Sequence, residues 1–147
     1  MAIRNPIVLI NGRPKSMPVG DSFPASLTPA HMIDIIGFQF TPITTTVTTD
    51  TLIAGSDFLW NTVYDAAGQS VYLETVGYGS AATTTTTVTL YTLAGVAVTG
   101  SATTAASVTA NRARSAALGL VDGTTYQVRW KSNAATGNLK SVRLVIM

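Results

Sequence analysis

The strongest pattern along the chain is a strict alternation of apolar and polar positions near its C-terminal end. Tyr126, Val128 and Trp130 alternate with polar side chains. This is the period of a β-strand with one buried face, and it predicts a strand over residues 125–131. Residues 139–147 repeat the pattern after a short polar loop, with Val142, Leu144 and Ile146 inward and Lys140 as the exception. We expect this last segment to pair back on the preceding one.

Shorter strand-like runs separated by turn residues fill the middle of the chain. They cover residues 38–48, 58–64, 71–78, 84–93, 96–99 and 105–110. No window keeps a 3.6-residue apolar period, which limits helix to a short turn at 30–36 or 112–118. About eight strands in one domain predict an all-β fold, a single jelly-roll-like antiparallel β-sandwich.

The first 30 residues have a different character from the rest. They carry five of the six prolines, Pro6, Pro14, Pro18, Pro24 and Pro29. Because proline lacks an amide donor and disfavours helix before it, we expect an extended N-terminal arm over residues 1–30 and a sandwich domain over 31–147. Residues 7–10 of the arm read as an apolar strand that ends in the turn Asn11-Gly12. Such a strand must lie on the body of the protein or pair with a neighbouring chain.

Composition narrows the classes of function. Charged residues make up 11% of the chain, against roughly 25% in typical globular domains. A net charge of +2 from scattered cations predicts no nucleic-acid partner, and the absence of cysteine excludes disulfides and thiolate metal sites. No apolar run is long enough to cross a bilayer and no signal-peptide pattern is present, so we expect no membrane partner and assembly in the cytoplasm.

Candidate chemistry is sparse. His31 is the sole histidine, so one chain cannot build a histidine metal cluster or a Ser-His-Asp triad. Most acidic residues sit beside turns, where they usually stabilise the turn, although a calcium site built from loop aspartates stays possible. Glu74 is the one acid inside a predicted strand, and on a solvent-exposed face of the sheet it needs no special role. We expect no catalytic residue, no metal and no cofactor.

Two further groups of side chains allow alternative interpretations. Arg112 and Arg114 either bind an acidic surface of a partner or lie on a solvent-exposed strand edge. The large aromatic residues either form a sugar-stacking platform or, as we favour for most of them, belong to the core or to a subunit interface. They are Trp60, Tyr64, Tyr72, Tyr78, Tyr91, Tyr126 and Trp130.

The arm carries a recognisable phrase. It reads Asn-Pro-Ile-Val-Leu-Ile-Asn-Gly-Arg-Pro over residues 5–14 and Met-Pro-Val-Gly-Asp-Ser over residues 17–22. This resembles the opening of many tailed-bacteriophage virion proteins, which have a short apolar strand, an Asn-Gly turn and a Leu-Pro-Ala-Gly-Asp-Thr-like phrase. Met17, Val19 and Ser22 depart from that phrase. The resemblance is shared by head-decoration proteins, head fibres and tail-fibre attachment segments.

Among these classes, a compact sandwich without a repetitive shaft is most similar to a capsid decoration (cement) protein. The resemblance implies a non-enzymatic virion protein that binds the major capsid protein on the outer capsid surface, cements neighbouring capsomers and forms a homo-oligomer, a dimer or a trimer. The alternative is a head-fibre or tail-fibre attachment module, or one that binds host carbohydrate. The expected partner-binding residues are Pro6, Ile7, Val8, Leu9, Ile10, Arg13, Arg112 and Arg114.

Overall fold

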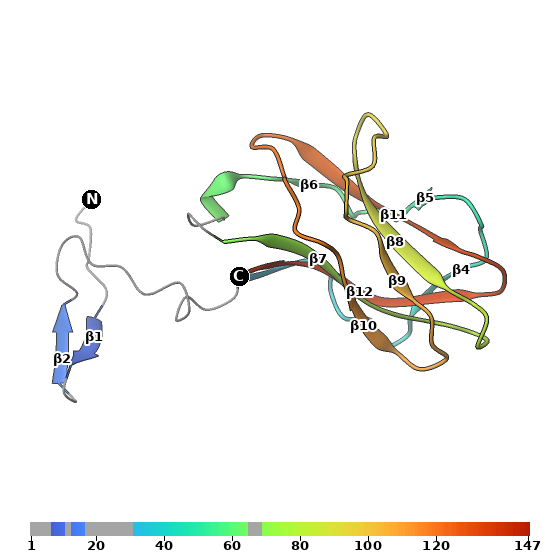
Figure 1. Ribbon diagram of the computed structural model, residues 1–147, viewed down its shortest axis with the longest axis horizontal. Coiled ribbons are helices and arrows are strands. Elements are labelled where there is room, and N and C mark those ends of the chain that lie inside the picture. Colours follow the sequence, from blue (N-terminus) through green and yellow to red (C-terminus); the bar gives the residue numbers. More distant parts are fainter. Residues whose placement is uncertain (1–6, 11–12, 17–30, 65–68) are drawn as a thin grey trace.

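The computed structural model describes residues 7–10, 13–16, 31–64 and 69–147. Two antiparallel β-sheets with a shared apolar core form the body of the protein (Figure 1). The predicted all-β sandwich is therefore confirmed. Several expectations lie outside the described residues: the contact at Pro6, the turn at Asn11-Gly12 and the phrase at 17–22.

The first sheet has the strand order β10-β7-β12-β3, and all its pairings are antiparallel. Its members are β10 (Asn111–Arg114), β7 (Val71–Gly79), β12 (Gly137–Ile146) and β3 (His31–Ile36), with β4 (Ile43–Thr45) also paired to β12. The long strands β7 and β12 lie at its centre and carry the site described below.

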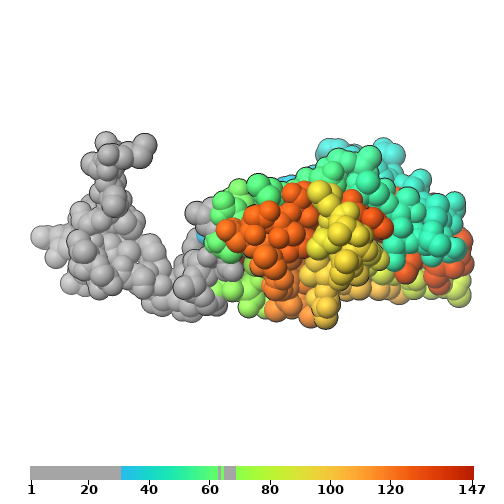
Figure 2. Space-filling view, turned by 90° about the horizontal axis from the view of Figure 1, so that it is seen from above, coloured from blue at the N-terminus to red at the C-terminus, as the bar shows by residue number. Residues whose placement is uncertain are grey.

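The second sheet has the order β5-β11-β8-β9. Its members are β5 (Thr51–Leu52), β11 (Thr125–Ser132), β8 (Thr86–Thr92) and β9 (Thr103–Ala105), with β6 (Phe58–Leu59) also paired to β11. A 3-10 turn, η2 (Thr62–Tyr64), follows β6. The space-filling view shows the yellow and orange segments side by side on one face of the molecule (Figure 2). Between these segments, the amide of Ala116 donates to the carbonyl of Gly100 at 3.2 Å.

The N-terminal segment contains a separate hairpin. Strand β1 (Ile7–Ile10) pairs antiparallel with β2 (Arg13–Ser16). The strand expected at residues 7–10 is therefore present, and its backbone partner is the segment that follows it in the same chain. Pairing of this strand with a neighbouring chain stays a prediction.

The core lies between the two sheets and is mainly apolar. Val128 from β11 and Leu90 from β8 are fully buried on one side, and Leu73 from β7 and Leu144 from β12 are fully buried on the other. The alternation predicted for residues 125–131 is confirmed, since Tyr126, Val128 and Trp130 all point into this core.

Several local predictions were wrong. Residues 38–48 do not form one strand, because the chain leaves the sheet after Ile36 and returns only at β4. The strands expected at 58–64, 96–99 and 105–110 are reduced to β6, to an isolated bridge at Ala97 and to the end of β9. Residues 31–36 form strand β3 and residues 111–114 form strand β10, so neither stretch that was a candidate for one short helical turn is helical there. Three isoleucines in β3 favour a strand, since β-branched side chains pack well on a pleated surface.

The expected pairing of the last two strands was also wrong. β11 and β12 are consecutive in the sequence but lie in opposite sheets, because β11 pairs with β8 and β12 pairs with β7 and β3. The loop between them crosses from one layer to the other. A bulge in β12 between Leu139 and Ser141 accounts for Lys140, the residue that broke the apolar alternation.

Candidate functional site

A row of alternating charges crosses the outer face of the first sheet. Arg114 of β10 lies opposite Glu74 of β7, Glu74 lies opposite Arg143 of β12, and Arg143 lies opposite Asp34 of β3. We call these four residues the charge row. Side chains directly opposite one another on antiparallel strands share one face of the sheet, so the register alone brings the four groups together.

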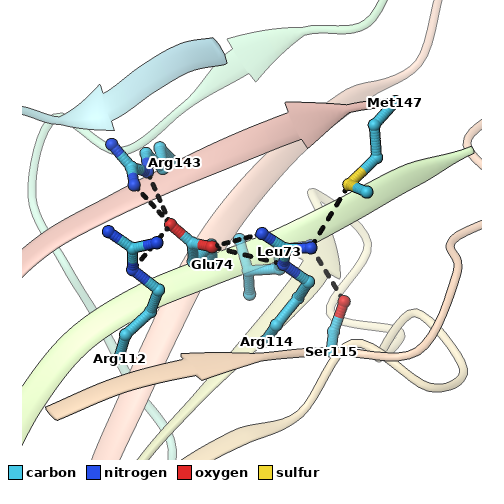
Figure 3. A network of polar contacts seen from close by, with 7 residues as sticks. All are labelled: Leu73, Glu74, Arg112, Arg114, Ser115, Arg143 and Met147. Carbon is cyan, nitrogen blue, oxygen red and sulfur yellow. Dashed lines mark hydrogen bonds and ion pairs between the residues drawn. The ribbon is translucent and has the colours of Figure 1, made fainter. Parts of the chain in front are cut away.

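Glu74 is the centre of this row. Its neighbours Leu73 and Thr75 face the core, so its carboxylate points to the outer face, yet only 1% of the side chain is exposed. Arg114 donates from Nε and Nη2 to Oε2 at 3.2 and 2.8 Å, and Arg143 donates from Nε and Nη2 to Oε1 at 2.8 and 2.5 Å (Figure 3). Each carboxylate oxygen therefore accepts two charge-assisted hydrogen bonds from one guanidinium group.

Arg112 adds a third guanidinium to the same carboxylate. Its Nε lies 3.5 Å from Oε1 of Glu74, and 62% of its side chain is exposed. Arg114 is more tightly held, since its Nη1 also contacts the sulfur of Met147 and its guanidinium lies over the ring of Tyr72. Three guanidinium groups against one carboxylate leave a surplus of two positive charges, and Arg112 carries the most accessible of them.

The arginines also set the protonation state of Glu74. Burial raises the pKa of its carboxyl group, but the hydrogen bonds from Arg114 and Arg143 and the charges of Arg143 and Arg112 lower it further than burial raises it. The pKa therefore lies below the ordinary value of 4.5. At neutral pH the centre of the site is an ionised carboxylate that holds the guanidinium groups in fixed positions.

The structure brings together only two of the predicted partner-binding residues. Arg112 and Arg114 share β10, an edge strand, and both contact Glu74. The backbone of residues 7–10 and of Arg13 is placed in the hairpin, and their side chains lie outside the description.

Sequence reasoning missed the roles of Glu74 and Arg143. Glu74 was expected on a wet face without a special role, and this was wrong because three guanidinium groups cover it. Its partners lie 38, 40 and 69 residues further along the chain, so only the sheet register reveals them. The one available signal was an acid inside an otherwise uncharged strand.

The aromatic residues divide into a buried and an exposed set. Trp60 and Trp130 are buried in the core, as favoured for most of the aromatics, and neither is available to stack on a sugar. The most exposed rings are those of Phe38 and Phe40, in the loop between β3 and β4, with ring centroids 5.8 Å apart, and Tyr64 is also exposed. Nζ of Lys140 lies 5.4 Å above the ring of Phe38.

Other chemical features are modest. His31 is exposed at the start of β3 and lines an open pocket of about 280 Å³ with Met32, Ile33, Tyr64 and Ile146. Among residues 31–64 and 69–147, no three acids, histidines or cysteines gather in a group that could hold a metal ion. No helix in the described part of the chain is long and apolar enough to cross a membrane.

The arrangement suits recognition of an anionic group. An exposed guanidinium at a sheet edge, fixed from behind by a buried carboxylate, presents paired donors of the kind that bind carboxylates. Comparison with protein-family models, with curated proteins and with solved structures finds no match for this chain.

Proposed function

We propose that this chain is a non-enzymatic structural protein of a tailed-phage virion, which binds the outer capsid surface and joins neighbouring capsomers as a homo-oligomer. The observation that carries the proposal is the phrase at residues 5–22, which resembles the opening of virion proteins and precedes a β-sandwich. In this function the hairpin strand at residues 7–10 contacts the shell or a sister subunit, and no active site is needed.

The strand order supports a finer assignment of the sandwich as a jelly roll. The chain crosses between the two sheets repeatedly. The first sheet contains β3, β7, β10 and β12, and the second sheet contains β5, β8, β9 and β11. The first sandwich strand, β3, therefore lies next to the last, β12. This is the arrangement that two interwound Greek keys produce, and viral capsid domains are among the proteins built on it.

Buried hydroxyl groups connect the parts of the sandwich on which the proposed jelly roll is built. Ser56 bonds both the amide and the carbonyl of Val128, and Ser101 does the same for Leu90. Ser115 accepts from the amide of Leu73 and donates to the carbonyl of Ala116. These hydroxyls join strands and loops of the sandwich, because a buried polar group must be hydrogen-bonded to be tolerated.

The exposed residue types support a binding surface. Phe40 is 91% exposed and Phe38 is 58% exposed, and water contact with so much aromatic surface is unfavourable in an isolated chain. Aromatic residues and arginine are enriched at protein interfaces. The loop with Phe38 and Phe40, together with Arg112, therefore supplies residues suited to an interface.

The test compares particle binding of two matched variants of the full chain. Val8→Asp with Ile10→Asp places charges on one side of the β1 strand, since alternate residues of a strand share a face. Val108→Asp makes the same kind of change at an exposed loop position of the sandwich. Each purified chain is mixed with native particles stripped of it and pelleted with them.

We expect the Val8/Ile10 variant to lose particle binding and the Val108 variant to keep it. Circular dichroism confirms that each variant is folded. Equal pelleting of all three chains would show that the hairpin strand does not bind the particle, and failure of the unaltered chain to pellet would overturn the virion function itself.

A further inference from the structure

The two edges of the first sheet carry opposite charges. β10 presents Arg112 and Arg114 at one edge, and β3 presents Asp34 at the other. Within the ranges that the structure describes, no strand pairs with the free side of β10 or of β3. Asp34 also forms no ion pair with any described residue, although it lies opposite Arg143.

We propose that β3 of one copy pairs with β10 of the next, so that the first sheet continues from subunit to subunit. The charge row ends in a cation at β10 and in an anion at β3. An added β3 would place Asp34 of the partner subunit beside Arg112 or Arg114 and continue the alternation of charges. The proposal rests on the proposed function only in taking a homo-oligomer as the assembled state.

The strand directions permit this pairing without any rearrangement. β10 is antiparallel to β7, β7 to β12, and β12 to β3, so β3 runs opposite to β10. A copy placed in line beside the first therefore meets it with an antiparallel pair, and the outer faces of the two sheets become continuous. The unpaired amide and carbonyl groups of both edges gain hydrogen bonds, as in other cases of strand addition.

Apolar surface near the edge would also be covered. Met32 lies two residues before Asp34 on the same face of β3 and is 57% exposed. In the proposed pair it would lie against the side chains that β10 presents, where the aliphatic stem of an arginine covers apolar surface while its charged end stays in water. The contact therefore combines backbone, charge and apolar terms along one strand edge.

The contact has a consequence for symmetry. Each copy uses β10 on one side and β3 on the other, so the interface is head-to-tail and differs from the self-complementary contact of a two-fold dimer. A head-to-tail contact closes into a ring when the rotation between copies permits. Without such a rotation it gives an open array of copies. Between the dimer and the trimer considered from the sequence, the trimer is the closed ring that this contact can form.

Charge reversal at the two edges tests the pairing in the full-length protein. Arg112→Glu and Asp34→Arg each place like charges opposite one another, and the double variant Arg112→Glu with Asp34→Arg restores opposite charges at unchanged net charge. Arg112 suits this test because its one ion pair, to Glu74, is long and its side chain is mostly exposed. Asp57→Arg is the matched control, an exposed acid outside both strands.

Sedimentation velocity over a concentration series reads out the assembly. We expect a ring larger than a dimer for the unaltered chain and for Asp57→Arg, a dissociation constant raised about tenfold or more by each single edge reversal, and recovery in the double variant. Charged edge residues can instead serve to block strand pairing. That role predicts a monomer, or an assembly that the reversals leave unchanged, and either result would overturn the proposal.

The outcome also separates this inference from the proposed function. An unaltered chain that binds particles and oligomerises, but is insensitive to both edge reversals, would refute the edge pairing and leave the virion function standing. A chain whose assembly responds to the edge reversals as expected, but which binds no particle, would refute the virion function and leave the edge pairing standing.

Discussion

Arg143 donates two hydrogen bonds to one oxygen of Glu74, from Nε at 2.8 Å and from Nη2 at 2.5 Å. The pair joins the two central strands of the first sheet, β12 and β7, on the face away from the core. Arg114 makes the equivalent connection from β7 to the edge strand β10. One buried carboxylate thus connects three neighbouring strands.

Glu74→Gln should therefore destabilise the fold. The neutral amide keeps the size of the carboxylate but leaves three guanidinium groups without their counter-charge. We expect a loss of about 1–3 kcal/mol in the free energy of unfolding, because the arginines are partly exposed and regain some hydration. Urea unfolding measures it, with Asp57→Asn as the control at an exposed acid. Equal stability of both variants would contradict the role of Glu74.

The contribution of Glu74 to the free energy of unfolding should also depend on pH. Because the pKa of Glu74 is lowered in the folded protein, its contribution is present above the unfolded value near 4.5 and is lost as pH falls through the folded pKa. The difference in unfolding free energy between the unaltered chain and Glu74→Gln should therefore shrink as pH falls below 4.5. A difference that stays constant through this acidic range would show that the pKa is not lowered.

Gly79→Ala should disrupt the end of β7. A Cβ at this position would lie 2.6 Å from the Cβ of Thr84 and would also clash with the backbone of that residue. Backbone cannot move aside as a flexible side chain can, so we expect a loss of about 1–3 kcal/mol in thermal or urea unfolding. Gly119→Ala is the control, since nothing lies within 4 Å of its added carbon, and it should be close to neutral.

Truncation of a buried aromatic side chain should destabilise the fold, whereas truncation of an exposed one should leave stability almost unchanged. Trp60→Ala removes a side chain that is 1% exposed and should cost about 3–5 kcal/mol of stability. Phe40→Ala removes one that is 91% exposed and should change stability by no more than about 0.5 kcal/mol. Denaturant unfolding of both variants checks this, and a large effect of Phe40→Ala would place its ring in a folded contact.

Elements with a strong local pattern could be predicted from the sequence. β11 alternates strictly, and β7, β8 and β12 lie within a residue or two of the expected runs. The pairing of β12 could not be predicted, because proximity in the sequence favours a hairpin whereas the buried faces of β11 and β12 pack against each other from opposite sheets. Layer assignment depends on the whole core and on no single segment.

The candidate site could likewise be predicted only in part from the sequence. The presence of Arg112 and Arg114 on a strand edge followed from the sequence as one of two alternatives, but their common partner did not. Glu74 becomes a buried ionic centre only because β7 lies between β10 and β12, an order set by long-range packing. Asp34 joins the row through a bulge in the register of β12 and β3, which no local pattern indicates.

Cryo-electron microscopy of the native particle tests the central claim most directly. If the chain is a capsid decoration protein, regular density that fits the β-sandwich will lie across capsomer boundaries on the outer shell, with the N-terminal hairpin against the shell or a sister subunit. Density confined to the tail or to fibre tips, or none on the particle, would contradict that function.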